Sequence, residues 1–557
     1  MIARAAAVSA LAAEEFDVVV VGGGITGAGV ALDAATRGFS VALVERHDFA
    51  SGTSSRSSKL VHGGLRYLQN FDLGLVREAL IERQIMVGLA PHLVKPLPLI
   101  VPAFDGARPD RMTGVGLNLY DVMSVDKLRS PLRRRREPDP NEAWSPDRHR
   151  IIDGAEVAEG LPALAPREPT SGYLFYDCQT DDVRLVLTVL AEAERFGAVC
   201  ANGLLVTELV EEGGRARGVR VRDQVSGEEL VVRAANVVNA TGVWADRLRP
   251  GELHDEAEVP IIRPSRGTHV TFRREDLPLN VGAIVPAGGG RFIFALPWLG
   301  GSLVGTTDTD YDATDLDHVK PADEDLEYLL DAVNEFFATE LTQSDITGAF
   351  AGVRPLISSS DAGKSVDISR KAELYETSSG MVTITGGKLT TWRRMAKMAV
   401  DRLVEREARD APCRTHEIPL GQPVEASELP RVEGVPESSY APLAARYGHA
   451  AHDVLVVAAE RGEHAQPVVE GQPDLLAEVV HAARREQART LGDVLLRRTR
   501  LGLVAARSVA GPDAASATAA RRVAEAMAPE LGWDAAGVDR AVAVFAEEAS
   551  AEGIVPG

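Results

Sequence analysis

Glycines and an acid near the N-terminus have the spacing of a dinucleotide-binding turn. Gly22, Gly24 and Gly27 follow a run of valines, and Glu45 ends the next apolar run. In this spacing the glycines permit a tight turn, let the backbone approach a pyrophosphate, and let the following helix pack on the strand. The N–H groups that begin the helix bind phosphate, and an acid in this place accepts hydrogen bonds from an unphosphorylated ribose. The pattern therefore predicts FAD or NAD rather than NADP.

The apolar runs on either side supply the strands that this turn requires. Residues 18–21 are β-branched without alternation, which is typical of a strand buried in a parallel sheet, and residues 40–44 form the next run. A strand, glycines, a helix, another strand and an acid within one βαβ unit favour a nucleotide site over an ordinary glycine-rich turn.

A dense group of hydroxyl side chains follows the acid directly. It lies in the segment TSSRSSKLVHGGLRYL (53–68) and comprises Thr53, Ser54, Ser55, Ser57 and Ser58. Such a cluster can bond a phosphate or the polar edge of a ring system, and the alternative interpretation is a polar surface loop. In the next residues, 62–67, the cationic side chain of Arg66 lies near Gly63 and Gly64, which allow close approach of the backbone.

Length, charge and cysteine content limit the class of protein. A chain of 557 residues is too long for one compact core, and predicts roughly two to four domains. The net charge of −21 argues against nucleic acid as a partner, and against electrostatic binding of the whole molecule to an anionic membrane. The cysteines, Cys178, Cys200 and Cys413, have neither a metal-binding spacing nor a disulfide framework, which fits a reducing cytosol. No apolar run reaches the length of a membrane-spanning helix.

Periodicity along the chain indicates the remaining elements. The first fifteen residues are interpreted as a disordered or weakly helical extension rather than a signal peptide. Alternation over 206–232 predicts a β-meander that leads into a buried strand at 236–240. Further expected elements are helices over 181–196, 321–337 and 389–405, strands within 260–310, and a buried strand at 381–385.

Several separated motifs together resemble those of the FAD-dependent glycerol-3-phosphate dehydrogenases, which share the flavoprotein fold of glycine oxidase and D-amino-acid oxidase. The resemblance is close over residues 16–405 and looser beyond them, and no single motif would suffice. The motifs are GGGITGAG (22–29), TSSRSSKLVHGGLRYL (53–68), ATGVWAD (240–246), GTTDTDY (305–311), GVRPL (352–356) and GGKLTTWRRMA (386–396).

The resemblance implies an α/β Rossmann-like FAD-binding domain with a β-rich substrate domain and a helical C-terminal domain. The expected division is an N-terminal extension (1–15), FAD-binding segments (16–90, 236–259 and 351–410), a mixed segment (91–235), a β-rich substrate-binding domain (260–350) and the helical domain (411–557). Within the helical domain, DVLLRRTRLG (493–502) resembles the family's C-terminal signature, without an assigned mechanism.

The resemblance also implies FAD as the cofactor. Gly242 would let the backbone lie against the adenosine. The helix after Gly387 would point its N–H groups at the flavin pyrimidine ring, where they favour the negative charge of the reduced flavin. The expected FAD-binding residues are Gly22, Gly24, Ile25, Thr26, Gly27, Glu45, Arg46, Thr53, Ser54, Ser55, Ser58, Lys59, His62, Gly63, Gly64, Ala240, Thr241, Gly242, Gly387, Lys388, Leu389 and Thr390.

Glycerol 3-phosphate, the implied substrate, carries a dianionic phosphate that needs cations. Arginine suits it because a guanidinium group grips phosphate oxygens bidentately. Arg354 is the main candidate, and the proline after it biases it to extended geometry. By resemblance Arg370, Arg66 and Tyr67 also bind the substrate. The alternatives are a solvated arginine for Arg370 and a surface salt bridge for Arg66.

Oxidation at C2 of this substrate would transfer a hydride to flavin N5 and the hydroxyl proton to a base. Histidine fits because its pKa lies near working pH. His269, in RGTHVTF, aligns with a family histidine, and the alternative is a purely structural histidine. His62 and Lys388 are rival bases. The expected catalytic residues are His269, Lys388 and Arg354.

The predicted function is FAD-dependent oxidation of sn-glycerol 3-phosphate to dihydroxyacetone phosphate, with electrons passed to a quinone-type acceptor. The alternatives are a glycerol-3-phosphate oxidase that uses oxygen, an amino-acid oxidase of the same fold, and a flavin-binding regulatory protein without turnover. A nicotinamide-dependent enzyme is disfavoured, because the ATG and GGKLTT segments would have no role in it.

The expected location is cytoplasmic, and peripheral contact with the inner face of the cytoplasmic membrane is the further alternative. The arginine run 133–136 is interpreted as a solvated loop. Its other interpretation is contact with anionic lipid headgroups, since family members donate electrons to a membrane quinone. The helical C-terminal domain is expected to cap the flavin domain or to form a homodimer.

Overall fold

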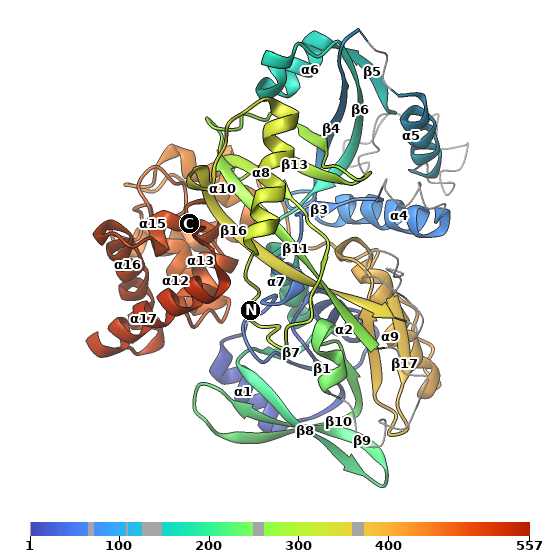
Figure 1. Ribbon diagram of the computed structural model, residues 1–557. Coiled ribbons are helices and arrows are strands. Elements are labelled where there is room, and N and C mark those ends of the chain that lie inside the picture. Colours follow the sequence, from blue (N-terminus) through green and yellow to red (C-terminus); the bar gives the residue numbers. More distant parts are fainter. Residues whose placement is uncertain are drawn as a thin grey trace.

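The computed structural model describes residues 2–64, 72–106, 110–124, 148–248, 261–358 and 372–556. Within these ranges the chain forms two sheets and a C-terminal group of helices, which confirms the predicted fold class. Figure 1 shows the first sheet at the bottom, the second sheet above it, and most of the C-terminal helices, in orange to red, at the left.

The first sheet is built around the run of valines that the sequence marks as a buried strand. These valines belong to β1 (Glu15–Val21), which pairs in parallel with β2 (Val41–Val44) and β10 (Glu229–Asn239). Apolar side chains cover both faces, which explains why the strands are apolar without alternation. The strand order is β17-β18-β10-β1-β2-β7, where β7 is Val199–Ala201, β17 is Ala372–Glu376 and β18 is Val382–Gly386.

The two faces of this sheet are covered by different elements. On one face α2 (Ile25–Thr36) packs against both α7 (Asp182–Arg195) and α9 (Trp392–Arg406). The other face carries the hairpin of β8 (Leu204–Glu212) and β9 (Arg215–Asp223). This hairpin and β10 form the predicted meander, and β10 continues to the ATG motif, so the meander and the predicted strand at 236–240 share one element.

The N-terminal extension is an ordered helix, whereas the sequence suggests disorder or weak helicity. This helix is α1 (Arg4–Ala13), and it contacts β7 and β10. Ala7 and Leu11, one turn apart, are fully buried, and Arg4 Nη2 lies 2.6 Å from Asp223 Oδ1. Alanines occupy several sides of the helix, so no apolar stripe stands out in the sequence.

The second sheet has the strand order β15-β11-β14-β13-β12-β4-β6-β3. In addition, β16 (Ile346–Ser358) pairs with β11 (Ile261–Arg273), and β5 pairs with β6. Helix α8 (Asp323–Phe337) packs on β11 and β12. The other strands are β3 (Leu60–Val61), β4 (Lys95–Ala103), β5 (Arg150–Asp153), β6 (Ser171–Gln179), β12 (Gly282–Pro286), β13 (Phe292–Trp298), β14 (Gly301–Gly305) and β15 (Thr309–Asp310). Beside them lie α4 (Leu73–Leu89), α5 (Arg111–Ser124) and α6 (Gly154–Gly160).

The long pair of β11 (Ile261–Arg273) and β16 (Ile346–Ser358) sets the register of the predicted substrate residues. His269 lies opposite Phe350 in this antiparallel pair. β16 stays in the second sheet throughout its length, so it crosses the border expected between 350 and 351. β3, within the first FAD-binding segment, also pairs into this sheet. The sheets therefore meet where the predicted site lies.

The C-terminal helices occupy the region expected to be helical; one apolar core lies among them, and another is shared with strands of the second sheet. They are α10 (Glu437–Tyr447), α11 (Ala451–Glu460), α12 (Leu476–Arg485), α13 (Leu491–Arg497), α14 (Leu501–Val504), α15 (Ala506–Ala510), α16 (Ala514–Leu531) and α17 (Ala535–Glu552). α14 contacts β11 and β16. Across the described ranges, no helix combines the length and apolarity needed to cross a membrane.

Replacing Leu11 with alanine tests whether α1 is part of the fold. Leu11→Ala removes fully buried volume, so we expect the free energy of unfolding to fall by about 2–5 kcal/mol. Ile2→Ala, at an exposed position before the helix, is the control and should change it by less than about 0.5 kcal/mol. Urea unfolding followed by tryptophan fluorescence measures both. Equal effects of the two substitutions would contradict the docking of α1.

Candidate active site

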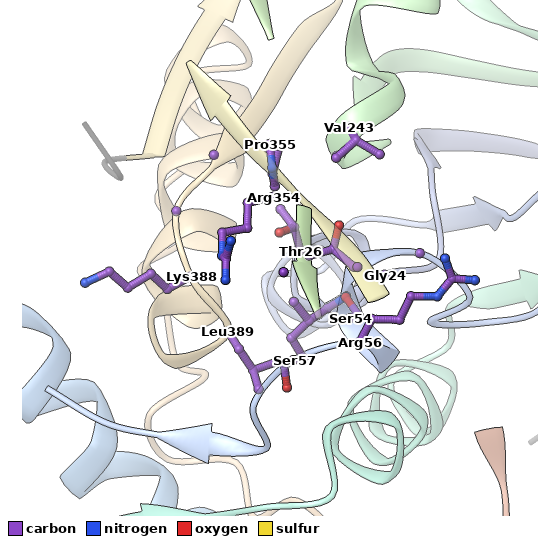
Figure 2. A pocket seen from close by; sticks show the side chains of 18 of the residues that line it. Gly24, Thr26, Ser54, Arg56, Ser57, Val243, Arg354, Pro355, Lys388 and Leu389 are labelled. Atoms are coloured by element: carbon purple, nitrogen blue, oxygen red, sulfur yellow. The ribbon is translucent and has the colours of Figure 1, made fainter. Parts of the chain in front are cut away.

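A cavity of about 580 Å³ opens at the carboxyl ends of the parallel strands. Residues that directly follow β1, β2, β10 and β18 line it, together with side chains of the second sheet (Figure 2). Cavities of this size bind small molecules and cofactors, and open α/β sheets form them at this edge.

The turn between β1 and α2 brings backbone close to backbone. Gly22 has a φ of +111°, and a Cβ on it would lie 2.7 Å from Ala240 O. A Cβ on Gly27 would lie 1.9 Å from Gly22 O. The N–H of Ile25, which begins α2, donates to Ser54 Oγ at 3.0 Å. The start of α2 therefore faces the hydroxyl-rich loop, in the arrangement that binds phosphate.

Glu45 lines the cavity and is held beside this turn. Its carboxylate accepts hydrogen bonds from the N–H of Gly23 at 2.6 Å and from the N–H of His47 at 2.8 Å. Burial raises the pKa of Glu45, and these hydrogen bonds oppose the rise. A carboxylate has about four acceptor positions, so positions remain for ribose hydroxyl groups.

The loop after β2, residues 45–59, covers the same edge of the sheet. Arg46 lies over the ring of Trp244, 4.8 Å from its centroid, and pairs with Asp317. Thr53 Oγ1 donates to Val353 O at 2.6 Å. The loop is thereby joined both to the ATGVWAD motif and to the second sheet.

The hydroxyl cluster divides between the cavity and the interior. Ser55 lies behind the cavity wall and donates to Gly52 O at 3.2 Å. Ser57 donates to Asp182 Oδ2 at 2.7 Å, although it also borders the cavity. The cluster members that line the cavity are Thr53, Ser54, Ser57 and Ser58.

Lys59 is expected to bind the cofactor, but the structure places its side chain in the interior behind the loop. The residue has a φ of +61°, and its side chain is fully buried. Its Nζ donates to Asp182 Oδ2 at 2.7 Å and to Ser55 O at 2.6 Å. Burial lowers the pKa of Lys59 to about 8, against the opposing effect of Asp182. The side chain of Lys59 therefore turns inward toward the buried carboxylate of Asp182, although the surrounding polar sequence suggests that it faces the cofactor.

His62 lines the cavity, whereas the neighbouring Gly63 packs against helices. A Cβ on Gly63 would lie 2.5 Å from Leu80 Cδ2, and the Gly63 N–H donates to Tyr120 Oη at 2.9 Å. The N–H of His62 donates to Thr390 Oγ1 at 3.2 Å. This contact joins the HGG segment to the GGKLTT segment, which are far apart in the sequence.

The segment before α9 forms another wall of the cavity. Gly387 has a φ of +66°, and a Cβ on it would lie 2.4 Å from Met395 Sδ. A 3₁₀ turn, Leu389–Thr391, follows and lines the cavity with Leu389 and Thr390, and α9 starts directly after it. Figure 2 shows the Lys388 side chain extending away from Arg354.

Arg354, on β16, enters the cavity from the second sheet and is held by the GTTDTDY motif (Figure 2). Its guanidinium donates to Thr306 Oγ1 at 3.1 Å, to Thr307 O at 3.0 Å and to Asp308 Oδ1 at 3.2 Å. About a fifth of the side chain, 22%, stays exposed. The arrangement fixes the direction of a cation that can still meet a ligand.

His269, on β11, lines the same cavity with its ring almost fully buried. Its Nε2 lies 2.8 Å from Ser58 Oγ, and its ring stacks on Phe350 with centroids 4.8 Å apart and an interplanar angle of 8°. A Cβ on Gly305 would lie 2.2 Å from His269 Cδ2, so only glycine leaves room for the ring. Three neighbours therefore fix the orientation of the imidazole.

The surroundings of His269 favour the neutral form of its imidazole. Burial lowers its pKa well below the usual value of 6.5, and the cations of Lys59 and Arg354 lower it further. A neutral imidazole can accept a proton.

The structure brings most of the predicted FAD-binding residues together. Those behind the cavity wall are Gly27, Ser55, Lys59 and Gly63. Those lining the cavity are Gly22, Gly24, Ile25, Thr26, Glu45, Arg46, Thr53, Ser54, Ser58, His62, Gly64, Ala240, Thr241, Gly242, Gly387, Lys388, Leu389 and Thr390. Arg66, Tyr67, Arg370 and the arginine run 133–136 lie outside the described residues.

Sequence reasoning missed several residues of the cavity. Trp244, Thr306 and Asp308 belong to motifs that the sequence shows, yet nothing in their spacing assigns them a partner. Arg56 lies within the hydroxyl cluster and also lines the cavity. The position of these residues inside motifs was the available signal, and only the fold shows what they contact.

Comparisons with known proteins show the family to which this chain belongs. A family model described as FAD dependent oxidoreductase matches residues 17–402, and one described as the C-terminal domain of alpha-glycerophosphate oxidase matches residues 382–538. A glycerol-3-phosphate dehydrogenase 2 of Mycobacterium tuberculosis is 39% identical, over 99% of this chain and 90% of that protein. The mitochondrial glycerol-3-phosphate dehydrogenase of Mus musculus is 36% identical, over 93% of this chain and 71% of that protein.

A solved structure gives the same result at the level of the fold. The glycerol-3-phosphate dehydrogenase of Bacillus halodurans, complexed with FAD, has a TM-score of 0.76 and 28% identity, and the match covers 99% of this chain and 97% of that chain. The chain belongs to the FAD-dependent oxidoreductases and, within them, to the glycerol-3-phosphate dehydrogenase family. FAD, the predicted cofactor, is confirmed, and the glycine turn and Glu45 fit its pyrophosphate and ribose.

Replacing Gly27 with alanine tests the cofactor turn. The added Cβ would overlap Gly22 O, so we expect FAD affinity to fall more than about tenfold, which is roughly 1.4 kcal/mol. Gly74→Ala is the control, because that helical glycine has open space around its Cβ position. The flavin absorbance of protein freed of unbound FAD measures occupancy. Full flavin content in Gly27→Ala would contradict the tight approach of the backbone.

Proposed function

We propose that the protein oxidises sn-glycerol 3-phosphate to dihydroxyacetone phosphate and passes the electrons to a quinone-type acceptor. The observation that carries this proposal is the pair of Arg354 and His269 in one cavity with the FAD-binding turn. Its relatives are named for this substrate, and the full length of the chain aligns with them.

In this proposal the second sheet binds the phosphate. Arg354 presents a guanidinium whose direction is fixed by Thr306 and Thr307. Its charge is partly balanced by Asp308, so an incoming dianion needs further cations. Arg66 and Arg370, with Tyr67, remain the proposed additional ligands.

The neutral imidazole of His269 takes the hydroxyl proton at Nε2, the nitrogen that Ser58 Oγ contacts. Bound FAD supplies the acceptor for the hydride that leaves C2 of the substrate. A dianionic substrate raises the pKa of a nearby imidazole, because an opposite charge favours the protonated form. His62 and Lys388 remain rival bases within the same cavity.

An exposed apolar stripe on α5 supports an apolar electron acceptor and peripheral membrane contact. Met112, Val115, Leu119 and Val122 lie on one face of the helix, and Met112 and Val122 are 76% and 71% exposed. Thr113, on the same helix, lines the cavity. We therefore propose that a quinone approaches the cavity beside α5, at the inner face of the cytoplasmic membrane.

The first test is an anaerobic visible spectrum during titration with glycerol 3-phosphate. We expect the wild-type flavin band to bleach, while glycine and proline leave it unchanged. In Arg354→Lys, the apparent KM for glycerol 3-phosphate should rise roughly 10- to 100-fold, because lysine keeps the charge but lacks the bidentate fork.

The outcomes of this titration separate the alternatives. A flavin that stays oxidised would contradict the substrate and leave the cofactor in place. Bleaching by an amino acid would favour the amino-acid oxidase. Faster reoxidation by air than by a water-soluble quinone would favour the oxidase that uses oxygen.

The stripe on α5 can be tested with vesicles of phosphatidylcholine and phosphatidylglycerol. Replacing Met112, Val115 and Val122 together with glutamine should weaken co-sedimentation roughly tenfold or more, because apolar surface no longer enters the interface. The matched control replaces three exposed valines elsewhere, Val225, Val456 and Val544, with glutamine. Equal losses in both variants, or none in the first, would contradict a specific role of α5.

A further inference from the structure

Buried arginines of the C-terminal domain reach the loop that lines the FAD site. Arg497 ends α13, and Arg498 and Arg500 follow in the link to α14. The side chains of Arg498 and Arg500 are fully buried, and that of Arg497 is 7% exposed. These residues form the RRTR part of the C-terminal signature, for which the sequence offers no mechanism.

The first contact is with Asp48, near the start of the 45–59 loop. Arg498 binds it bidentately, with Nη1 at 2.8 Å from Oδ2 and Nη2 at 2.9 Å from Oδ1. Arg497 Nε adds a bond of 2.8 Å to Oδ2. A second contact reaches the same loop from α17, where Glu552 Oε1 lies 2.6 Å from Arg56 Nη2.

The contact that leads to the catalytic histidine starts at Arg500. Its Nη2 lies 2.8 Å from Asp181 Oδ1 and also donates to Asp182 Oδ1. Arg500 holds a φ of +69°, which residues other than glycine rarely adopt. A backbone in this conformation persists only where its surroundings fix it, and here the buried ion pairs do so.

Asp182 is the centre of this arrangement. Its Oδ1 accepts a hydrogen bond from the guanidinium of Arg500. Its Oδ2 accepts hydrogen bonds from the Ser57 hydroxyl at 2.7 Å, from the Ser57 N–H at 3.2 Å and from Lys59 Nζ at 2.7 Å. The side chains of Asp182, Lys59 and Arg500 are all fully buried. In such a dry site the orientation of the carboxylate depends on both cations, because each oxygen is committed to one of them.

From Asp182 the link continues to two of the three neighbours that orient His269. Ser58, next to Ser57, lies 2.8 Å from His269 Nε2. Lys59 Nζ lies 4.8 Å from the centroid of Phe350, the ring that stacks on His269. A separate contact supports β11, the strand that carries His269. Thr271, two residues after His269, donates to Leu503 O at 2.6 Å.

We propose that Arg500 is a positioning residue for the reaction. Through Asp182 it sets the Ser57–Ser58 backbone and the Ser58–His269 hydrogen bond, so the C-terminal domain completes the geometry of the active site. This inference rests on the proposed role of His269 as the base. A merely structural role for Arg500 would affect stability, and FAD content with it, without a separate effect on the imidazole or on the chemical step.

The test compares Arg500→Met with Arg184→Met in the FAD-loaded protein. Arg184 is the matched control, because it is buried on the same helix as Asp182 and its guanidinium binds Glu486 and Tyr447 of the C-terminal helices. In Arg500→Met, the rate of anaerobic flavin reduction by glycerol 3-phosphate should fall roughly 10- to 100-fold. FAD content, substrate KM and reduction by dithionite should stay within about twofold of wild type. Arg184→Met should keep the wild-type rate.

A readout independent of turnover is the ¹⁵N spectrum of histidine-labelled protein, with the His269 signals assigned by their loss in His269→Gln. We expect the His269 ring signals to shift or broaden in Arg500→Met and to remain unchanged in Arg184→Met. Arg500→Lys should give an intermediate rate, since one ammonium cannot serve both Asp181 and Asp182 as a guanidinium does. This variant also keeps the test available if Arg500→Met does not fold.

The results separate the inference from the proposed function. A wild-type protein that glycerol 3-phosphate does not reduce would contradict the proposed function, and the His269 spectrum would still decide the positioning. Unchanged His269 signals and an unchanged rate in Arg500→Met would overturn the inference. So would equal losses of rate in Arg500→Met and Arg184→Met, which would show a general effect of the domain border.

Discussion

The close approach of the β1–α2 turn to the end of β10 is the constraint on which the site depends. It exists because Gly22 and Gly27 have no Cβ. At either position, a Cβ would lie within 3 Å of a carbonyl oxygen. With the turn closed, α2 directs its first N–H groups at the hydroxyl-rich loop, and the Gly23 N–H reaches Glu45. The other walls of the cavity are arranged around this fixed edge, from the 45–59 loop to the segment that begins α9.

Charge, rather than apolar contact alone, fixes the 45–59 loop. Asp48, Arg56 and Lys59 each meet an opposite charge with little or no exposure to solvent. Buried charges are costly unless they are paired in good geometry, so each pair tolerates only a narrow range of positions. Because unpaired buried charges are costly, the 45–59 loop needs the C-terminal domain, which supplies most of the opposite charges that pair with the loop.

The sequence predicts the parts of this site that depend on local pattern. The valines of β1, the glycine turn and Glu45 lie where their spacing indicates, because strand period and turn geometry are local properties. Lys59 differs, because its partner Asp182 is far away in sequence and no local pattern shows which side chain turns inward. The sequence does not predict the docking of α1 for a related reason. Alanine occurs against a sheet as readily as in solvent, so Leu11 alone does not indicate a buried face of the helix.

The two sheets divide the work of the site, and the division has a consequence for specificity. The first sheet supplies the glycine turn and Glu45, which would serve any ligand with a pyrophosphate and a ribose. The second sheet supplies Arg354 and His269, which line the same cavity and are the residues proposed to act on the substrate. Both depend on the GTTDTDY motif, because Thr306 and Thr307 hold the guanidinium of Arg354 and Gly305 leaves room for the ring of His269. A change in this motif is therefore expected to alter the phosphate ligand and the proposed base together, while the glycine turn of the FAD site keeps its geometry.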